Sequence, residues 1–279
     1  MKKILYSLIV CAGVLTFAAC DDSVEDNSRL TYLVDLQVEK ATIEHQVNTE
    51  FTAPKFTATE NGVDVSAKVT VKGLDKVNED KIGIYPISYS VANSDGYLST
   101  AKQTVYVVNA EADTDISGDY TIAIDDRLPH HIGSYCKKSD GTIEPFSTAY
   151  PLTVTKVATG IFTISDMLGG WMNLKEGKGT DFALSANYSL DESLDFTLTN
   201  PHKVSFGLSG LKDKLMMGEE GEEKEVKTLN SPTVTVISPA TSTETTTNKV
   251  VLVLQWDVEY DGREIHVVAT TEKKIESEE

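Results

Sequence analysis

Cys20 is the first residue whose position points to a defined chemistry. It follows a basic start, an apolar run over residues 4–17, and Ala18-Ala19. A basic segment, an apolar segment and small residues at the cut are the features of a secretory signal peptide. A cysteine directly after the small residues predicts cleavage before Cys20 and acylation of its thiol and new amino group. The apolar run is shorter than the roughly 20 residues of a spanning helix. We therefore expect residues 1–19 to be a lipoprotein signal peptide and lipid to hold the chain on a membrane.

A tryptophan among glycines is the second feature. Trp171 follows Gly169-Gly170, whereas Trp256 lies in a run of apolar residues that is typical of a buried strand. Sugars stack on exposed aromatic rings, and amides and carboxylates bind their hydroxyls. Trp171 is thus either a ligand platform or a hydrophobic plug of its domain. The candidate ligand-binding residues are Trp171, Tyr135 and Tyr150 as stacking surfaces, with Asp166 and Asn173 as polar partners.

The sequence carries none of the familiar catalytic motifs. It has no glycine-rich phosphate loop, no G-x-S-x-G and no H-E-x-x-H. The adjacent His130-His131 would point to opposite faces of a strand, so this pair favours a surface loop over a metal site. Cys136 would be the one free thiol of the mature chain, which excludes an internal disulfide and favours a small buried side chain. We expect no enzyme, no metal and no cofactor.

Composition limits the partners. The chain has 279 residues and a formal net charge of −18. This negative charge repels phosphate backbones, so we expect no nucleic acid partner, and it disfavours docking on an anionic membrane. Residues 20–29 are acidic and polar, which predicts a tether. The length after the signal peptide fits one large or two modest β domains.

Residues 30–109 alternate apolar and polar positions between turn signals. The turns include Asn61-Gly62 and Asp95-Gly96, which are strong hairpin signals between β-branched runs. Five to seven short strands in such a length predict a small antiparallel sandwich. The runs that carry a family resemblance are TATENGVDV (57–65), VTVKG (69–73) and KIGIYPISYSV (81–91). They resemble bacterial Ig-like domains, and the resemblance implies a β-sandwich that acts as a spacer.

After a short acidic linker (110–114), residues 115–272 read as a second β domain, and residues 273–279 as a charged tail. About eight antiparallel strands predict a closed barrel or a curved sandwich. Residues 207–227 are rich in Lys and Glu, which predicts a mobile loop. The expected strands cover residues 120–124, 150–158, 160–165, 182–190, 193–199, 231–238, 249–260 and 263–271. The fold class is therefore all-β.

The second domain also resembles a known family. The runs ISGDY (116–120), YPLTVTKV (150–157) and GIFTISDMLGGW (160–171) resemble the C-terminal domain, of unassigned function, of Bacteroides-type lipoproteins. Such chains often belong to Sus-like (starch-utilisation-system-like) loci. The acidic residues after Cys20 resemble the surface-export signal of Bacteroidetes lipoproteins.

These resemblances imply a lipid-anchored outer-membrane protein that faces the extracellular side. The implied partners are a polysaccharide or oligosaccharide and a Sus-like outer-membrane transport complex. The alternative is an adhesin or structural component that binds a protein by strand addition or through a flat patch.

Overall fold

The fold is given by a computed structural model, which describes residues 31–124, 133–192, 203–212, 214–237 and 249–274. The signal peptide, Cys20, the tether to residue 29, His130-His131 and the strand expected at 193–199 lie outside these residues. The expected all-β class is confirmed, with 54% strand and 7% helix. No helix of the described residues is long and apolar enough to cross a membrane. The domain limits expected at residues 109 and 115 stay a prediction.

The chain divides into two compact units. The first comprises residues 31–37, 56–70 and 89–101. Its three-stranded sheet has the order β1-β3-β4, made of β1 (Asp35–Val38), β3 (Phe56–Glu60) and β4 (Val63–Asp64). The expected turn is present, because Asn61 and Gly62 have φ values of 49° and 77°, as a two-residue hairpin loop requires. Val34, Ala58, Val65 and Val91 form its apolar core.

The second unit comprises residues 38–55, 71–88 and everything from residue 102. A four-stranded sheet, whose strands β5, β6 and β7 contain residues of both units, has the order β2-β7-β6-β5, and β2 runs parallel to β7. Two 3-10 turns, η1 (Ser66–Lys68) and η2 (Leu74–Lys76), flank β5. The strands are β2 (Thr42–Gln46), β5 (Thr70–Lys72), β6 (Gly83–Ala92) and β7 (Leu98–Val108). The N-terminal part of the chain is all-β, as expected, but the parallel pairing of β2 with β7 departs from the purely antiparallel sandwich that the sequence predicted.

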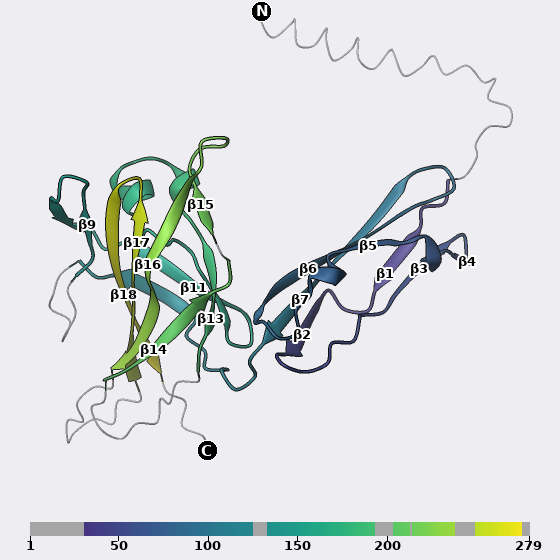
Figure 1. The fold of residues 1–279 in the computed structure, drawn as a ribbon, viewed down its shortest axis with the longest axis horizontal. Helices are drawn as coiled ribbons and strands as arrows, with labels where there is room; N and C mark the ends of the chain where they lie inside the picture. Colours follow the sequence, from purple (N-terminus) through teal and green to yellow (C-terminus); the bar gives the residue numbers. More distant parts are fainter. Residues whose placement is uncertain (1–30, 125–132, 193–202, 213, 238–248, 275–279) are drawn as a thin grey trace, which may run out of the picture. The chain divides into compact units, whose positions relative to one another are not determined.

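Eight antiparallel strands of the second unit form a closed barrel (Figure 1). Each strand pairs with the next, and β18 pairs back to β8 through Ala269 opposite Ile122 and Thr270 opposite Thr121. The structure thus decides for the barrel over the sandwich. Its strands are β8 (Gly118–Ile122), β11 (Pro151–Ala158), β12 (Ile161–Ile164), β13 (Ala186–Leu190), β14 (Lys203–Gly210), β16 (Lys224–Ile237), β17 (Lys249–Tyr260) and β18 (Arg263–Lys274).

Three short strands extend the barrel wall. β9 (Tyr135–Lys137) pairs with β18, and β10 (Ile143–Pro145) pairs with β9. β15 (Leu215–Met217) pairs with β16. The expected Asp-Gly turn joins β17 to β18, where Asp261 and Gly262 have φ values of 49° and 73°.

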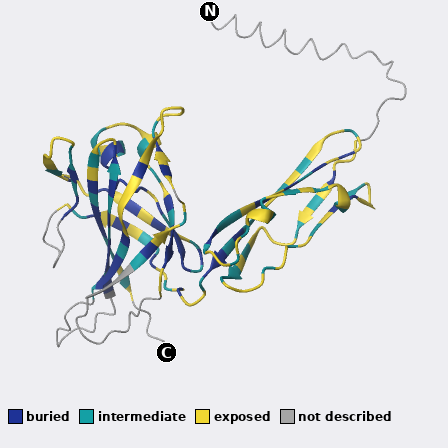
Figure 2. Cartoon of the chain, in the orientation of Figure 1, coloured by how far each residue is buried: buried dark blue, intermediate teal, exposed yellow. Residues whose placement is uncertain are grey.

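Side chains fill the barrel. Every second residue of β17 from Val250 to Tyr260 is buried, with at most 4% exposure (Figure 2). A barrel of eight strands is just wide enough for its side chains to fill the interior. The lumen is therefore a packed core, and Cys136 belongs to it as the expected buried free cysteine.

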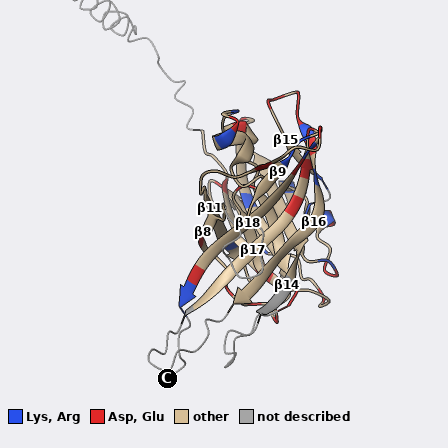
Figure 3. Ribbon diagram, turned by 90° about the vertical axis from the view of Figure 1, so that its left-hand side faces the viewer, with Lys and Arg blue, Asp and Glu red and all other residues tan. Residues whose placement is uncertain are grey.

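The expectation of a mobile loop over residues 207–227 is wrong. This segment contains the end of β14, all of β15 and the start of β16. Leu215 and Met217 are buried and Met216 between them is 49% exposed, while Val226 is buried beside the exposed Glu225 and Lys227, which is the alternation of a strand. In Figure 3 the charges of β16–β18 gather toward the strand ends.

Candidate functional site

The loop between β12 and β13 closes the barrel, and Asp166 lies at the start of this loop. Its Oδ1 accepts a hydrogen bond from the Leu168 N–H and its Oδ2 accepts one from the Gly170 N–H, both at 2.9 Å. Asp166 is 8% exposed. Burial raises the pKa of Asp166 to about 6, although the main-chain hydrogen bonds oppose the rise. Both oxygens thus fix the loop.

The two glycines let this loop lie close against its neighbours. Gly169 and Gly170 have φ values of 60° and 83°, which side chains rarely permit. A Cβ at Gly170 would lie 3.0 Å from the Tyr150 ring. The π-helical turn η3 (Trp171–Lys175) follows. Loop and turn form the plug, which we define as residues 166–175.

Trp171 is buried within the plug. It is 0% exposed, and its ring lies 4.8 Å from that of Phe146, centroid to centroid. The Lys175 Nζ lies 5.7 Å from the Trp171 ring centroid, within the range of a cation–π contact. The proposed role of Trp171 as an exposed stacking platform is therefore wrong, and the alternative, a hydrophobic plug, describes the structure.

Of the other four candidate residues, Tyr150, Asp166 and Asn173 lie in or against the plug, whereas Tyr135 lies in β9. Tyr150, 9% exposed, and Asp166 pack within or against the plug, so the structure gives both a structural role instead of a ligand contact. Asn173 lies half-buried in η3. Tyr135 lies in β9, where its ring stacks on His266 at 5.0 Å between centroids. The structure therefore brings Trp171, Tyr150 and Asp166 together, but in packing and hydrogen-bond contacts within the protein.

A polar cluster surrounds His266. Its Nδ1 lies 2.6 Å from Asp257 Oδ1, and the Asn230 Nδ2 donates to Asp257 Oδ2 at 2.7 Å. The hydrogen bonds of His266 and Asn230 hold the pKa of Asp257 below its usual value. Because these residues come from β16, β17 and β18, the cluster joins three neighbouring strands.

A pocket of about 370 Å³ opens where β16 leaves β14 and pairs with β15. We call it the wall pocket. Tyr188, 3% exposed, lines it beside Gly210, its partner across the ladder. Burial raises the pKa of Tyr188, and a hydrogen bond with the Thr228 side chain opposes the rise. The polar lining comprises Asn187, Lys212, Glu225, Lys227, Thr228 and Ser231.

The wall pocket can hold a polar ligand. Asn187, Thr228 and Ser231 carry neutral donors and acceptors, whereas Lys212, Glu225 and Lys227 offer charge. The Asn187 Oδ1 accepts a hydrogen bond from the Thr163 Oγ1 at 2.6 Å and the Thr228 hydroxyl bonds with Tyr188, so the remaining groups of these side chains are the ones that a ligand would meet. Two of the charges are engaged in ion pairs, Lys227 with Glu259 at 3.0 Å and Glu225 with Lys214 at 3.8 Å. The sequence did not reveal this pocket, because its residues come from four strands, β13, β14, β15 and β16, and many of them lie in the segment 207–227 that was expected to be a loop.

Both halves of the chain match known protein families. Residues 38–107 match the family of bacterial surface protein Ig-like domains, and residues 109–271 match the BT2262-like C-terminal domain. The lipoprotein BT2262 from Bacteroides thetaiotaomicron is 26% identical, with a TM-score of 0.35; the match covers 86% of this chain and 100% of BT2262. No curated protein matches the chain.

A second solved structure contains CBM51-2 in complex with GlcNAc, and INT domains, from ZmpB of Clostridium perfringens. It is 17% identical, with a TM-score of 0.25, and the match covers 84% of this chain and 43% of that one. At such a TM-score the likeness carries no inference about a ligand. The match to the C-terminal family covers more than half of the sequence. The chain therefore belongs to the BT2262-like C-terminal domain family, with a bacterial surface Ig-like domain ahead of it.

Proposed function

We propose that this chain is a lipid-anchored protein on the extracellular face of an outer membrane, and that it binds glycan without converting it chemically. Cys20 carries the lipid in this proposal. The Ig-like domain, which belongs to a family of bacterial surface domains, serves as the spacer. The barrel domain presents the binding site.

The wall pocket is the observation that carries the proposal. A sugar offers many hydroxyl groups around a ring, so a site for it needs several neutral donors and acceptors that converge on a small volume. Asn187, Thr228 and Ser231 supply them in a pocket of about 370 Å³, within the range of ligand sites, roughly 300–1,000 Å³. The described side chains inside the barrel are largely buried core residues, which favours the wall pocket over the lumen as the ligand site.

Capture on a surface needs little affinity at each site. Many copies on one membrane bind a long polysaccharide at several points, so the combined attachment is far stronger than a single contact. A Sus-like outer-membrane transport complex is the partner to which such a protein would pass its glycan.

The test uses the soluble chain from Asp21 in affinity gels that contain a panel of polysaccharides. The Lys212→Ala and Thr228→Val substitutions remove one charge and one hydroxyl from the wall pocket. Thr228→Val is expected to weaken glycan binding about two- to tenfold, since a lost hydrogen bond costs about 0.5–1.5 kcal/mol, and Lys212→Ala by about tenfold or more, since a bond to a charged group costs about 1.5–3 kcal/mol. Lys102→Ala, which removes an exposed lysine of β7, is the matched control and should bind as the unsubstituted chain does.

Each outcome has a consequence. Equal retardation of all variants would remove the wall pocket as the site, and no retardation on any polysaccharide would favour the adhesin alternative. Release of new sugar products during incubation would contradict a non-catalytic role. Fractionation of cells that carry Cys20→Ala tests the anchor separately, because this variant should leave the membrane fraction.

A further inference from the structure

The charges at the wall pocket do not cancel one another. Lys227 pairs with Glu259 at 3.0 Å, and Glu225 pairs with Lys214 at 3.8 Å. Among the residues that the structure describes, none forms an ion pair or a side-chain hydrogen bond with Lys212, an exposed residue of the pocket lining. Three lysines thus face two glutamates, and Lys212 supplies the positive charge in excess.

This local charge is opposite in sign to that of the whole chain. The sequence has 43 Asp and Glu residues against 25 Lys and Arg residues. Salt screens the interaction between exposed charges that are more than about 8–10 Å apart, so a ligand in the wall pocket responds mainly to the charges beside it. An anion that enters the pocket therefore meets an attractive charge, although the chain as a whole repels it.

The side chains that remain for a ligand are mainly hydrogen-bond donors. The Asn187 Oδ1 accepts a hydrogen bond from the Thr163 Oγ1 at 2.6 Å, which leaves the Asn187 Nδ2 and its two N–H donors. The Lys212 Nζ also only donates, whereas the Ser231 hydroxyl can donate or accept. Glu225, the one carboxylate among the described lining residues, is engaged in its ion pair. The lining thus offers a ligand more donors than acceptors.

An excess of donors favours an anionic sugar over a neutral one. A neutral sugar hydroxyl both donates and accepts, so a site that is built for it supplies acceptors as well as donors. A carboxylate or a sulfate group only accepts, and its hydrogen bonds to a charged donor are roughly twice as strong as those between neutral groups. Lysine binds such a group as a point charge, without the fixed geometry that arginine requires.

We propose that the wall pocket binds an acidic sugar unit, with Lys212 as the counter-charge of its carboxylate or sulfate group and Asn187 as a further donor. This inference rests on the proposed function, because it names the substrate class of the same site. Neutral units of a polysaccharide would lack the charged contact, so the pocket would select polysaccharides by their charge.

Matched pairs of polysaccharides isolate the charge of the ligand. Affinity gels contain polygalacturonate or its methyl ester, and a sulfated galactan or the same galactan after desulfation. The two members of a pair share one backbone, so the anionic group is the difference between them. Relative to a reference protein that binds no polysaccharide, the soluble chain from Asp21 should be retarded more by the charged member of at least one pair. The pair that does so identifies the group as carboxylate or sulfate.

Variants separate the charge of the pocket from its shape. Lys212→Ala should weaken binding of the charged member by about tenfold or more, because it removes a charged donor, and Lys212→Arg should retain the binding. Glu225→Gln removes a negative charge from the lining, so it should strengthen this binding about twofold. Lys102→Ala removes an exposed lysine of β7 that does not line the pocket, and it should bind as the unsubstituted chain does.

Four results would overturn the proposal. They are equal retardation by both members of every pair, binding of a charged member that Lys212→Ala leaves intact, an equal loss in Lys102→Ala, and weaker binding in Glu225→Gln. If neutral polysaccharides retard the chain and Thr228→Val weakens this retardation, the wall pocket remains the glycan site and only the acidic sugar is wrong. If no polysaccharide retards the chain, glycan binding itself fails, so the two failures can be told apart.

Discussion

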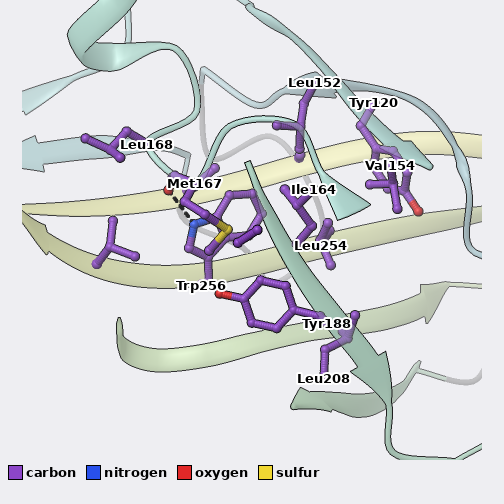
Figure 4. Close-up of a cluster of buried hydrophobic side chains, with 14 of the residues drawn as sticks. Tyr120, Leu152, Val154, Ile164, Met167, Leu168, Tyr188, Leu208, Leu254 and Trp256 are labelled. Carbon is purple, nitrogen blue, oxygen red and sulfur yellow. Dashed lines mark hydrogen bonds between the residues drawn. The ribbon is translucent and has the colours of Figure 1, made fainter. Parts of the chain in front are cut away.

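The Trp256 Nε1 donates a 2.7 Å hydrogen bond to the main-chain carbonyl of Met167, 89 residues away (Figure 4). This bond joins the inside of β17 to the plug. The second buried indole differs, since the Trp171 Nε1 has no hydrogen-bond partner among the described residues. The two tryptophans thus fill the core alike, but one of them also fixes the plug through a polar contact.

Phenylalanine at the two tryptophan positions separates these contributions. Both Trp256→Phe and Trp171→Phe remove part of a buried ring, but only the first leaves the Met167 carbonyl without its donor. We expect Trp256→Phe to lower the free energy of unfolding by about 1–3 kcal/mol more than Trp171→Phe does. Urea unfolding of both variants measures the difference. Equal losses would show that the bond adds nothing beyond packing.

Alanine at Gly170 tests the packing of the plug against Tyr150. Both Gly170 and Gly177 have positive φ, 83° and 65°, so alanine strains the backbone at either position by about 1–2 kcal/mol. A Cβ at Gly170 would also meet the Tyr150 ring at 3.0 Å, whereas nothing lies within 4 Å at Gly177. We expect Gly170→Ala to cost about 1–3 kcal/mol more than Gly177→Ala. Thermal and urea unfolding check this, and equal costs would mean that the ring moves aside freely.

Trp171→Ala should act on stability and not on ligand affinity. The side chain is 0% exposed and packs on Phe146, so its loss should cost about 3–5 kcal/mol. Below the melting temperature of the variant, its retardation in polysaccharide gels should equal that of the unsubstituted chain. Lost retardation by a folded variant, as judged by circular dichroism, would return Trp171 to the ligand site.

Local signals predicted much of the barrel. The sequence placed strands at 249–260 and 263–271 around an Asp-Gly turn, and the structure has β17 at Lys249–Tyr260 and β18 at Arg263–Lys274. Turn residues and the alternation of apolar and polar residues are local patterns that span only a few positions, so the sequence alone can show them. Barrel closure depends instead on Ala269 beside Ile122, a contact between distant positions that no local pattern records.

The candidate site was harder to predict for a related reason. A tryptophan after two glycines indicated an exposed turn, yet those glycines allow Trp171 to fold into the barrel end. Trp171 packs on Phe146, and Tyr150 lies against Gly170 of the plug; both precede Trp171 by about 20 positions or more. The wall pocket likewise combines Asn187 with Thr228, whose proximity follows from the order of the strands.

The buried Asp166 makes the stability of the fold depend on pH. Its pKa is raised to about 6 in the folded chain from a usual 3.8, because burial disfavours the charged form. Between these values the folded state holds a proton that the unfolded state has lost. The free energy of unfolding therefore falls as pH rises through this window, by at most about 3 kcal/mol from this group, and the full loss is present above the folded pKa.

Asp166→Asn removes this titration, so comparison of the two chains isolates it. We expect the stability of the unsubstituted chain relative to Asp166→Asn to fall between about pH 4 and pH 6, the window set by the two pKa values. Urea unfolding across this range measures the change. Asp181→Asn, at an exposed position, controls for the loss of one negative charge and should follow the unsubstituted chain. A constant difference across the range would show that Asp166 stays charged in the fold. In that case its hydrogen bonds to Leu168 and Gly170 would outweigh burial.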